Sequence, residues 1–232
     1  MTTITPAIEV DSVSRVYAQG TEAMTVALTD VTFRIEPGDL VAIIGPSGSG
    51  KSTLLNLIGG LDRPSSGRVL IDGVDISRIP NAELAKIRNR KIGFVFQSFN
   101  LIGRLTAVEN VELPLLVTST PRAKIRERAL ELLGEFGIRN KADRRPNQMS
   151  GGEQQRVAVA RALSTDPLVI LGDEPTGNLD TKSTKVMVDL LLKMNREMKR
   201  TIVVITHNLD IAAQFKKVIS IRDGRVVEIY EN

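Results

Sequence analysis

Cysteine and tryptophan are absent from the sequence, and aromatic residues make up only 3% of it. A chain without cysteine forms no disulfide and no thiolate metal or redox centre, which excludes disulfide-stabilised secreted domains. Long hydrophobic runs are also absent. The longest stretch without a charged residue, Ile92 to Gly103, is far shorter than the roughly 18 apolar residues of a membrane-spanning helix. The first residues have neither a basic start nor an apolar core, so we expect no secretory signal and a cytoplasmic location.

The chain has 232 residues, of which 42% are hydrophobic and 25% charged, as in folded globular proteins. This length suits one domain with an inserted subdomain. The net charge of +4 is local, because residues 122–145 hold eight Lys or Arg against four Asp or Glu. Nucleic-acid surfaces usually add stacking aromatics, and this segment has only Phe136, so we expect no nucleic-acid partner. A solvated helix face and a membrane-proximal surface both remain open for this segment.

Two kinds of β-rich run predict two kinds of strand. Short runs bounded by turn residues predict half-buried antiparallel strands, and these are IEVDSV, VTFRI and Val69–Ile71. Runs that are apolar throughout are typical of parallel strands covered by helices on both faces, and these are Val41–Ile44, Leu168–Leu171 and Ile202–Ile205. The end of the chain, KVISI followed by a turn and VVEIY, predicts a hairpin.

Helical patterns dominate between Phe99 and Ser164, where Pro121 can begin a helix and Gly137 can end it. A further helix is predicted over Thr181–Lys199. Its core-facing residues recur at intervals of four, and they are Val186, Leu190, Met194 and Met198.

The segment from Gly45 to Ser52 matches the phosphate-binding pattern GxxxxGK[ST] at every fixed position, after an apolar strand and before a predicted helix. Its glycines let backbone N–H groups face phosphate oxygens, Lys51 can reach the β- and γ-phosphates, and the Ser52 hydroxyl can bind Mg²⁺. A glycine-rich turn matching by chance is the alternative. The candidate nucleotide-binding residues here are Gly45, Pro46, Ser47, Gly48, Ser49, Gly50, Lys51, Ser52 and Thr53.

Two acidic residues, Asp173 and Glu174, follow the apolar run Leu168–Leu171 and a single glycine. At the end of a strand beside a phosphate-binding loop, Asp173 is placed to hold Mg²⁺ and Glu174 to polarise a water that attacks the γ-phosphate. Paired acids after a strand can instead cap a helix.

A second anion site is predicted at Ser150–Gln154, where Ser150 can cap a helix whose first turn contains two glycines. One chain would then have two phosphate-binding helix starts but only one set of Mg²⁺ ligands. This imbalance suggests that each helix start serves a different copy of the chain.

The string SGGEQQ resembles the signature motif of the ATP-binding cassette (ABC) ATPases, and other motifs of that family follow in order over essentially the whole chain. Gln97 resembles the glutamine of the Q-loop, Asp180 the D-loop aspartate and His207 the switch histidine, while Tyr17 resembles the aromatic that stacks on adenine. Without the resemblance, Gln97 and Asp180 would be ordinary solvated residues and His207 a structural histidine. Departures are Met149 before the signature serine and Gly172 before Asp173.

The resemblance implies the cofactors ATP and Mg²⁺ and a role for each matching residue. The catalytic residues would be Glu174, His207, Gln97 and Lys51. The metal ligands would be Ser52, Gln97 and Asp173. The opposite protomer would contribute Ser150, Gly151, Gly152, Glu153, Gln154 and Asp180 to each nucleotide.

The resemblance also implies a single ABC ATPase domain over residues 1–232 with an α/β fold. Its P-loop NTPase core has a mainly parallel sheet and comprises residues 1–97 and 165–232, including a flanking antiparallel β subdomain. An inserted α-helical subdomain would occupy about residues 98–164. Two copies would form a head-to-tail dimer around ATP and drive a separate membrane permease at the cytoplasmic face of the plasma membrane.

Three strings, VFQSFNL, TAVENVELPL and DEPTGNLD, resemble the branch that contains lipoprotein-release and macrolide- or peptide-export ATPases and the cell-division ATPase. A non-transport transmembrane complex of the cell-division type is therefore an alternative to a transporter. A DNA-repair ATPase would carry long heptad repeats, which are absent, and a catalytically idle nucleotide-binding module would not need Lys51, Asp173, Glu174 and His207.

An apolar segment, Ser98–Leu105, follows Gln97. Two interpretations of Phe99, Leu101 and Leu105 remain open. They pack under the helical insertion, or some of them line a groove that receives a cytoplasmic helix of the permease.

Overall fold

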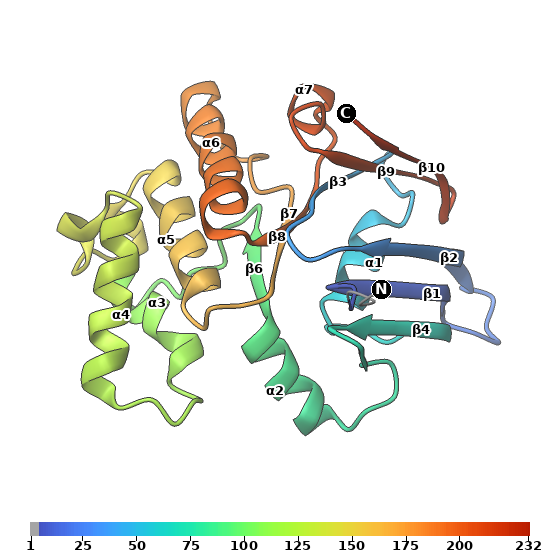
Figure 1. Cartoon of the computed structure of the whole chain (residues 1–232), viewed down its shortest axis with the longest axis horizontal. Helices are drawn as coiled ribbons and strands as arrows, with labels where there is room; N and C mark the ends of the chain where they lie inside the picture. The colour runs from blue at the N-terminus through green and yellow to red at the C-terminus, as the bar shows by residue number, and fades with distance from the viewer. Residues whose placement is uncertain (1–4) are drawn as a thin grey trace.

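The computed structural model describes residues 5–232, so residues 1–4, with which the predicted domain begins, lie outside it. Its larger sheet has the strand order β10-β9-β3-β8-β7-β6 (Figure 1). Adjacent strands are parallel except β10, which runs antiparallel to β9. The strands are β3 (Leu40–Ile44), β6 (Ile92–Phe96), β7 (Val169–Asp173), β8 (Thr201–Ile205), β9 (Lys217–Arg222) and β10 (Arg225–Glu231). The three continuous apolar runs are thus adjacent parallel strands, and the predicted hairpin is β9–β10.

The smaller sheet is antiparallel, with the order β2-β1-β4-β5. Its strands are β1 (Ile8–Tyr17), β2 (Thr25–Ile35), β4 (Ser66–Ile71) and β5 (Val74–Asp75). The alternating runs near the start of the chain therefore form antiparallel strands, as their pattern predicts. The described residues form an α/β structure in which a mainly parallel sheet is flanked by this second sheet.

The parallel sheet separates two cores. Val41, Ile43 and Val203 point to a core shared with α1 (Lys51–Ile58) and the smaller sheet, while Ala42 and Val204 point to the opposite core. The sequence predicted helices on both faces, and this is only partly correct for the first face, which is covered by α1 together with the antiparallel sheet. With only eight residues, α1 is too short to cover that face alone.

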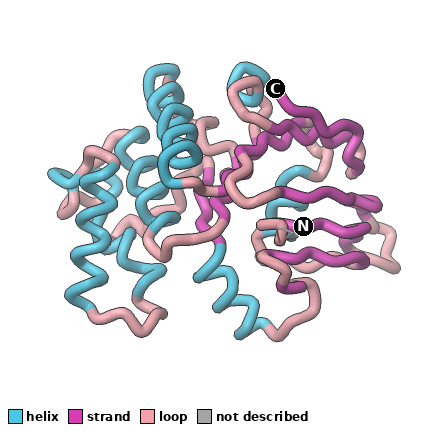
Figure 2. The backbone as a smooth tube through the Cα atoms, viewed as in Figure 1, coloured by secondary structure: helices cyan, strands magenta, loops and turns pink. Residues whose placement is uncertain are grey.

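Helices fill the chain between β6 and β7, to the left in Figure 1 and in cyan in Figure 2. They are α3 (Ala107–Glu112), α4 (Arg122–Glu135) and α5 (Gly151–Leu163), with 3₁₀ turns η1 (Leu113–Leu115), η2 (Arg139–Lys141) and η3 (Pro146–Gln148). Pro121 precedes α4 and Gly137 follows it with φ +67°, as predicted for its ends. The remaining helices are α2 (Asn81–Lys91), α6 (Thr181–Met198) and α7 (Leu209–Ala212). Within residues 5–232, none of the helices is both long enough and apolar enough to cross a membrane.

The predicted helix at Thr181–Lys199 exists as α6, but its predicted core face is partly wrong. Val186 is 44% exposed, and the buried side chains of α6 are Met187, Val188, Leu191 and Met194. A spacing of four residues exceeds the helical repeat of 3.6, so a strict i, i+4 series rotates away from the core. Met187 and Met194 are buried, in agreement with a packing role for methionine on this helix.

Candidate nucleotide-binding and hydrolysis site

The phosphate-binding loop joins the end of β3 to the start of α1. Gly48 and Gly50 adopt φ of +77° and +98°, which side-chain-bearing residues rarely reach. At Gly50 a Cβ atom would also lie 2.5 Å from the carbonyl oxygen of Ala27 in β2. Gly50 occupies the N-cap position of α1, where no side chain of residues 5–232 accepts a hydrogen bond from the first turn. The N–H groups at this end of α1 therefore remain available to an anion.

Lys51 lies buried inside the curve of this loop. Its Nζ donates hydrogen bonds to the carbonyl oxygens of Gly45 (2.9 Å) and Pro46 (2.7 Å). Two carbonyl acceptors leave one of the three ammonium protons free for a phosphate oxygen. Lys51 thus holds a positive charge inside the curve of the loop.

A cleft of about 540 Å³ opens above the loop. It brings together the loop, Glu174 from the end of β7 and His207 from just after β8. Sequence reasoning missed the third wall, which β2 provides, because an antiparallel strand carries no signal of what its end faces. The lining residues are Thr25, Val26, Ala27, Gly45, Ser47, Gly48, Gly50, Lys51, Ser52, Thr53, Glu174 and His207.

The carboxyl ends of β6, β7 and β8 lie level, because Phe96 pairs with Asp173 and Asp173 pairs with Ile205. Asp173 Oδ1 accepts a hydrogen bond from the Ser52 hydroxyl at 3.5 Å. Burial raises the pKa of Asp173, as does the neighbouring charge of Glu174, while Ser52 and Lys51 partly oppose the rise. Desolvated oxygen ligands beside a phosphate site suit a magnesium ion that also binds phosphate. Among residues 5–232 there is no cluster of three His, Cys, Asp or Glu side chains that would form a metal site without phosphate.

Glu174 and His207 form a direct pair, with His207 Nδ1 2.6 Å from Glu174 Oε2. With Nδ1 on the carboxylate, Nε2 is the ring nitrogen left for another partner, and the His207 side chain is 70% exposed. Glu174 has φ +45°, and its N–H donates to the carbonyl of Ile205. Glu174 is therefore held at the cleft by its backbone bond to β8 and by the contact of its carboxylate with His207.

The acidic pair does not cap a helix, so that alternative is wrong. The N-cap of α6 is Asp180, whose carboxylate accepts from the N–H (2.9 Å) and hydroxyl (2.8 Å) of Ser183. These bonds lower the pKa of Asp180. Asp180 thus has a structural role that the sequence did not reveal, beside its predicted place at a dimer interface.

Five predicted site residues of the chain's own nucleotide site do not line the cleft, and they are Pro46, Ser49, Asp173, Gln97 and Tyr17. Pro46 and Ser49 belong to the loop itself, and Asp173 contacts Ser52, whereas Gln97 and Tyr17 have other partners. Gln97 donates from Nε2 to Asn178 Oδ1 at 3.2 Å and lies over Gly177, where a Cβ would be 2.6 Å from that nitrogen. The Tyr17 hydroxyl donates to Asp62 at 2.9 Å, and the Arg15 guanidinium lies 4.4 Å from the ring centre. Their metal-binding and adenine-stacking roles stay predictions.

The signature segment begins α5 as its sequence predicts. Ser150 Oγ accepts from the N–H of Glu153 (3.3 Å), and Glu153 Oε2 accepts from the N–H of Ser150 (2.8 Å), which completes a capping box. These bonds lower the pKa of Glu153, with help from Lys141, whose Nζ lies 3.4 Å away. None of Ser150, Gly151, Gly152, Glu153 and Gln154 lines the cleft. The two helix starts predicted to bind anions are therefore separate in one chain.

The departures Met149 and Gly172 have a packing basis. Met149 is 8% exposed and belongs to the core beneath α5. At Gly172 a Cβ would lie 3.1 Å from Val204 and 3.2 Å from the ring of Pro175. The glycine lets Pro175 pack closely on β7 beside Glu174.

Comparison with known proteins adds to this geometry. The sequence profile of the family described as ABC transporter matches residues 28–177. The chain belongs to this ABC transporter family. It is 52% identical over 219 residues to an uncharacterized ABC transporter ATP-binding protein of Thermotoga maritima, covering 94% of this chain and 93% of the relative. It is also 47% identical over 223 residues to the macrolide export ATP-binding/permease protein MacB of Sodalis glossinidius, covering 96% of this chain but only 34% of that protein.

Solved structures agree with the family. The dimeric post-hydrolysis structure of the ATP-binding cassette MJ0796, bound to ADP and Pi, matches with a TM-score of 0.88 at 45% identity, covering 97% of this chain and 98% of that one. MJ0796 is a protein of Methanocaldococcus jannaschii. CbiO1 of Clostridium perfringens, part of the complex cbiONQ, matches with a TM-score of 0.87 at 31% identity, covering 98% and 89%. The chain is an ABC-type ATP hydrolase.

Proposed function

We propose that the chain is the motor subunit of an ABC transporter and binds two ATP molecules at a head-to-tail dimer interface. One observation carries this proposal. The helix starts of α1 and α5 both suit phosphate, but Glu174 and His207 line the α1 cleft, and Asp173 lies 3.5 Å from the Ser52 hydroxyl at its edge. In a dimer, the start of α5 from a second copy would complete the nucleotide site. The dimeric structures of MJ0796 support this arrangement.

Within this site we assign roles by position. Lys51 and the loop N–H groups bind the β- and γ-phosphates, and Glu174 accepts a proton from the attacking water. His207, held through Nδ1 by Glu174, donates to the γ-phosphate. Ser52 and Asp173 would hold magnesium, and Gln97, whose amide bonds Asn178, would be the third protein ligand. When bound, the magnesium ion neutralises phosphate charge.

The remaining predicted contacts complete the proposed nucleotide site. Tyr17 stacks on adenine from the strand position opposite Thr25, which lines the cleft. From the second copy, Ser150 keeps its hydroxyl proton for a phosphate oxygen because its Oγ already accepts from Glu153. Gly151, Gly152, Glu153, Gln154 and Asp180 of that copy surround it.

Ser150→Ala tests the division of the site between two copies. We expect the nucleotide affinity of the monomer to stay within about twofold, because Ser150 lies outside the cleft of its own chain. ATP-dependent dimerisation and turnover should fall at least tenfold, because the variant loses one charge-assisted hydrogen bond that contributes about 1.5–3 kcal/mol. Nucleotide titration at low protein concentration and light scattering at high concentration measure the two effects. Thr106→Ala, which removes the same kind of capping box at the start of α3, controls for loss of a cap. A loss of monomer affinity in Ser150→Ala would contradict the model of a shared site.

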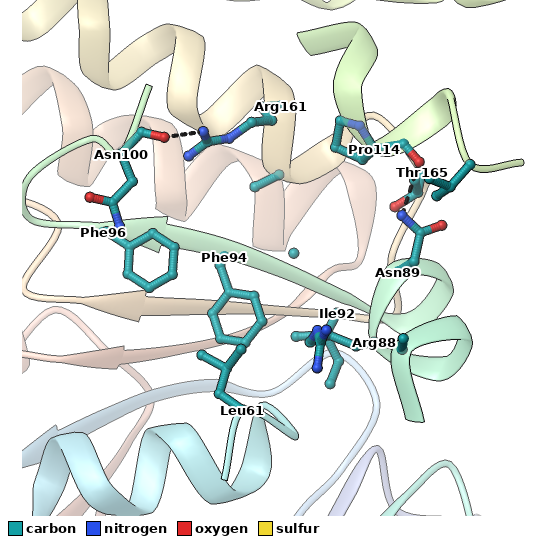
Figure 3. Close-up of a pocket in the computed structure, with 14 residues that line it drawn as sticks. Leu61, Arg88, Asn89, Ile92, Phe94, Phe96, Asn100, Pro114, Arg161 and Thr165 are labelled. Atoms are coloured by element: carbon teal, nitrogen blue, oxygen red, sulfur yellow. Dashed lines mark hydrogen bonds between the residues drawn. The ribbon is translucent and has the colours of Figure 1, made fainter. Parts of the chain in front are cut away.

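We further propose that a membrane permease binds in a groove of about 510 Å³ between α2, β6 and α5. Figure 3 shows Phe94 and Phe96 on its floor and Arg161 reaching Asn100. Asn89 of α2 donates to the carbonyl of Pro114 and joins two walls. Val117, which is 77% exposed, extends the apolar surface at the rim. Such an apolar groove beside the loop after Gln97 suits a cytoplasmic helix, and the permease would hold the chain at the membrane.

The apolar side chains of Ser98–Leu105, which one interpretation of the sequence assigned to permease docking, do not line this groove. Leu101 packs against the core, and Leu105 lines a separate hollow between α3 and α4. Neither Phe99, Leu101 nor Leu105 lines the groove. Backbone carbonyls of Phe99 and Asn100 instead accept hydrogen bonds from Arg161, at 2.9 and 2.5 Å. This segment shapes the groove mainly through its backbone.

Val117→Asp therefore tests the groove better than a change at Leu101. We expect basal ATP hydrolysis of the isolated chain to stay within about twofold, since surface substitutions are usually within about 0.5 kcal/mol. Copurification with the permease and stimulation by it should be lost, because a carboxylate would have to be buried at the interface. Val227→Asp on β10, 57% exposed, is the matched control. Unchanged stimulation of Val117→Asp by the permease would move the docking surface elsewhere.

For the transported substance we propose a lipoprotein, macrolide or peptide, and the name of the MacB relative supports the macrolide. A transmembrane complex of the cell-division type is the second candidate within the same branch. Identification of the permease that copurifies with the chain from detergent-solubilised membranes distinguishes them.

A further inference from the structure

One buried polar contact of α5 has no part in the proposed site. The Gln155 side chain is 1% exposed, and its Nε2 donates to the carbonyl oxygen of Pro175 at 2.6 Å. Its Oε1 is buried without a hydrogen-bond partner among residues 5–232. Pro175 comes directly after Glu174, so a helix that begins at Ser150 contacts the residue next to Glu174.

Backbone and side-chain groups both hold the turn that follows Glu174. The Gly177 N–H donates to the Glu174 carbonyl oxygen at 2.9 Å, and Gln155 donates to the carbonyl oxygen of Pro175. A proline has no N–H, so its carbonyl is the polar backbone atom by which that residue can be held. On the other side, the Glu174 N–H is bonded to Ile205 of β8, and Glu174 itself has a left-handed φ of +45°. A residue with a side chain adopts this conformation only when its surroundings hold it there. Gln155 supplies the contact from α5.

The contact also joins two ends of the proposed dimer site within one chain. Gln155 lies five residues after Ser150, about 7.5 Å along a rigid helix. The start of α5 faces the nucleotide of the second copy in the proposed function, whereas Glu174 faces the nucleotide of its own chain. A shift of α5 when its Ser150 end binds phosphate would therefore reach Glu174 through Gln155.

We propose that Gln155 is a positioning residue for Glu174, which sets the carboxylate according to the position of α5. This proposal rests on the proposed function, because it assigns hydrolysis to Glu174 and the start of α5 to a second copy. The competing explanation is that the hydrogen bond from Gln155 to Pro175 only stabilises the fold. Loss of a positioning contact lowers kcat in the folded protein, whereas loss of a purely structural contact lowers only the stability.

Gln155→Leu removes the donor while keeping a buried side chain of similar size. We expect kcat to fall about 10- to 100-fold, the effect of a small misplacement of a catalytic group, with KM and monomer affinity for ATP within about twofold. The structural control is Val159→Ala in the same helix, where the side chain is fully buried in the core. It should lower the melting temperature without lowering kcat at temperatures where the chain is folded. If Gln155→Leu does not fold, Gln155→Met serves as the same test with a more adaptable side chain.

A double variant separates positioning from structure. Because Gln155 acts through Glu174, adding Gln155→Leu to Glu174→Gln should leave the residual single-turnover rate unchanged. The proposal is overturned if the two changes multiply, or if Gln155→Leu lowers kcat less than about threefold in a folded protein. It is also overturned if the loss matches the loss of folded protein, as in Val159→Ala. Failure of the proposed function would look different, because Glu174→Gln alone would then hydrolyse ATP normally.

Discussion

Glu174→Gln is expected to slow ATP hydrolysis about 10²- to 10⁴-fold, the contribution of a well-placed general base. The amide keeps the shape of the side chain and can still pair with His207 Nδ1, which lies 2.6 Å from the carboxylate, but it accepts a proton poorly. Affinity for ATP should stay within about threefold, since the phosphate contacts of Lys51 and the loop are untouched. Phosphate release under single-turnover conditions measures the first effect and nucleotide titration the second.

The same variant should accumulate as a dimer in the presence of ATP, because the nucleotide bridge forms and is not hydrolysed. Glu228→Gln on the exposed strand β10 is the control for loss of one carboxylate, and it should hydrolyse ATP at the normal rate. Size-exclusion chromatography at high protein concentration with ATP and Mg²⁺ gives the oligomeric state. Elution of Glu174→Gln as a monomer under those conditions would rule out the shared site while leaving the catalytic role of Glu174 open.

Lys51→Ala is expected to abolish both nucleotide binding and turnover. Each charge-assisted hydrogen bond to phosphate contributes about 1.5–3 kcal/mol, which corresponds to about a 10- to 150-fold loss of affinity per bond. The change also leaves the carbonyl oxygens of Gly45 and Pro46 without their buried donor, so the empty loop itself should lose order. Both effects act in the same direction on ATP affinity.

Titration with a fluorescent ATP analogue measures this loss, and circular dichroism checks that the chain is folded. Lys185→Ala, an exposed lysine of α6, is the matched control and should bind ATP normally. Normal ATP affinity in Lys51→Ala would contradict the assignment of Gly45–Ser52 as the phosphate-binding loop. Weak binding in both lysine variants would indicate a general effect of net charge.

The local sequence was sufficient for most features that depend on neighbours in the chain, although the cap that Asp180 forms with Ser183 was missed. Left-handed backbone at Gly48 and Gly50 is encoded by glycine itself, and the capping box at Ser150 needs only the side chain of Glu153, three residues on. Continuous apolar runs predicted parallel strands because a strand buried on both faces has no polar alternation. The apolar run Leu168–Leu171 in the same way placed Asp173 and Glu174 at the end of a strand.

Only the tertiary structure decided which of these features meet. Glu174 and His207 are far apart in sequence and pair because β7 and β8 lie side by side with their carboxyl ends level. The wall from β2, the face of α6 that is buried and the contact of Gln155 with Pro175 likewise depend on how elements pack. Strand order and helix rotation are set by the burial of apolar surface over the whole chain. Because this burial is non-directional, no local pattern in the sequence specifies which two segments will pack together.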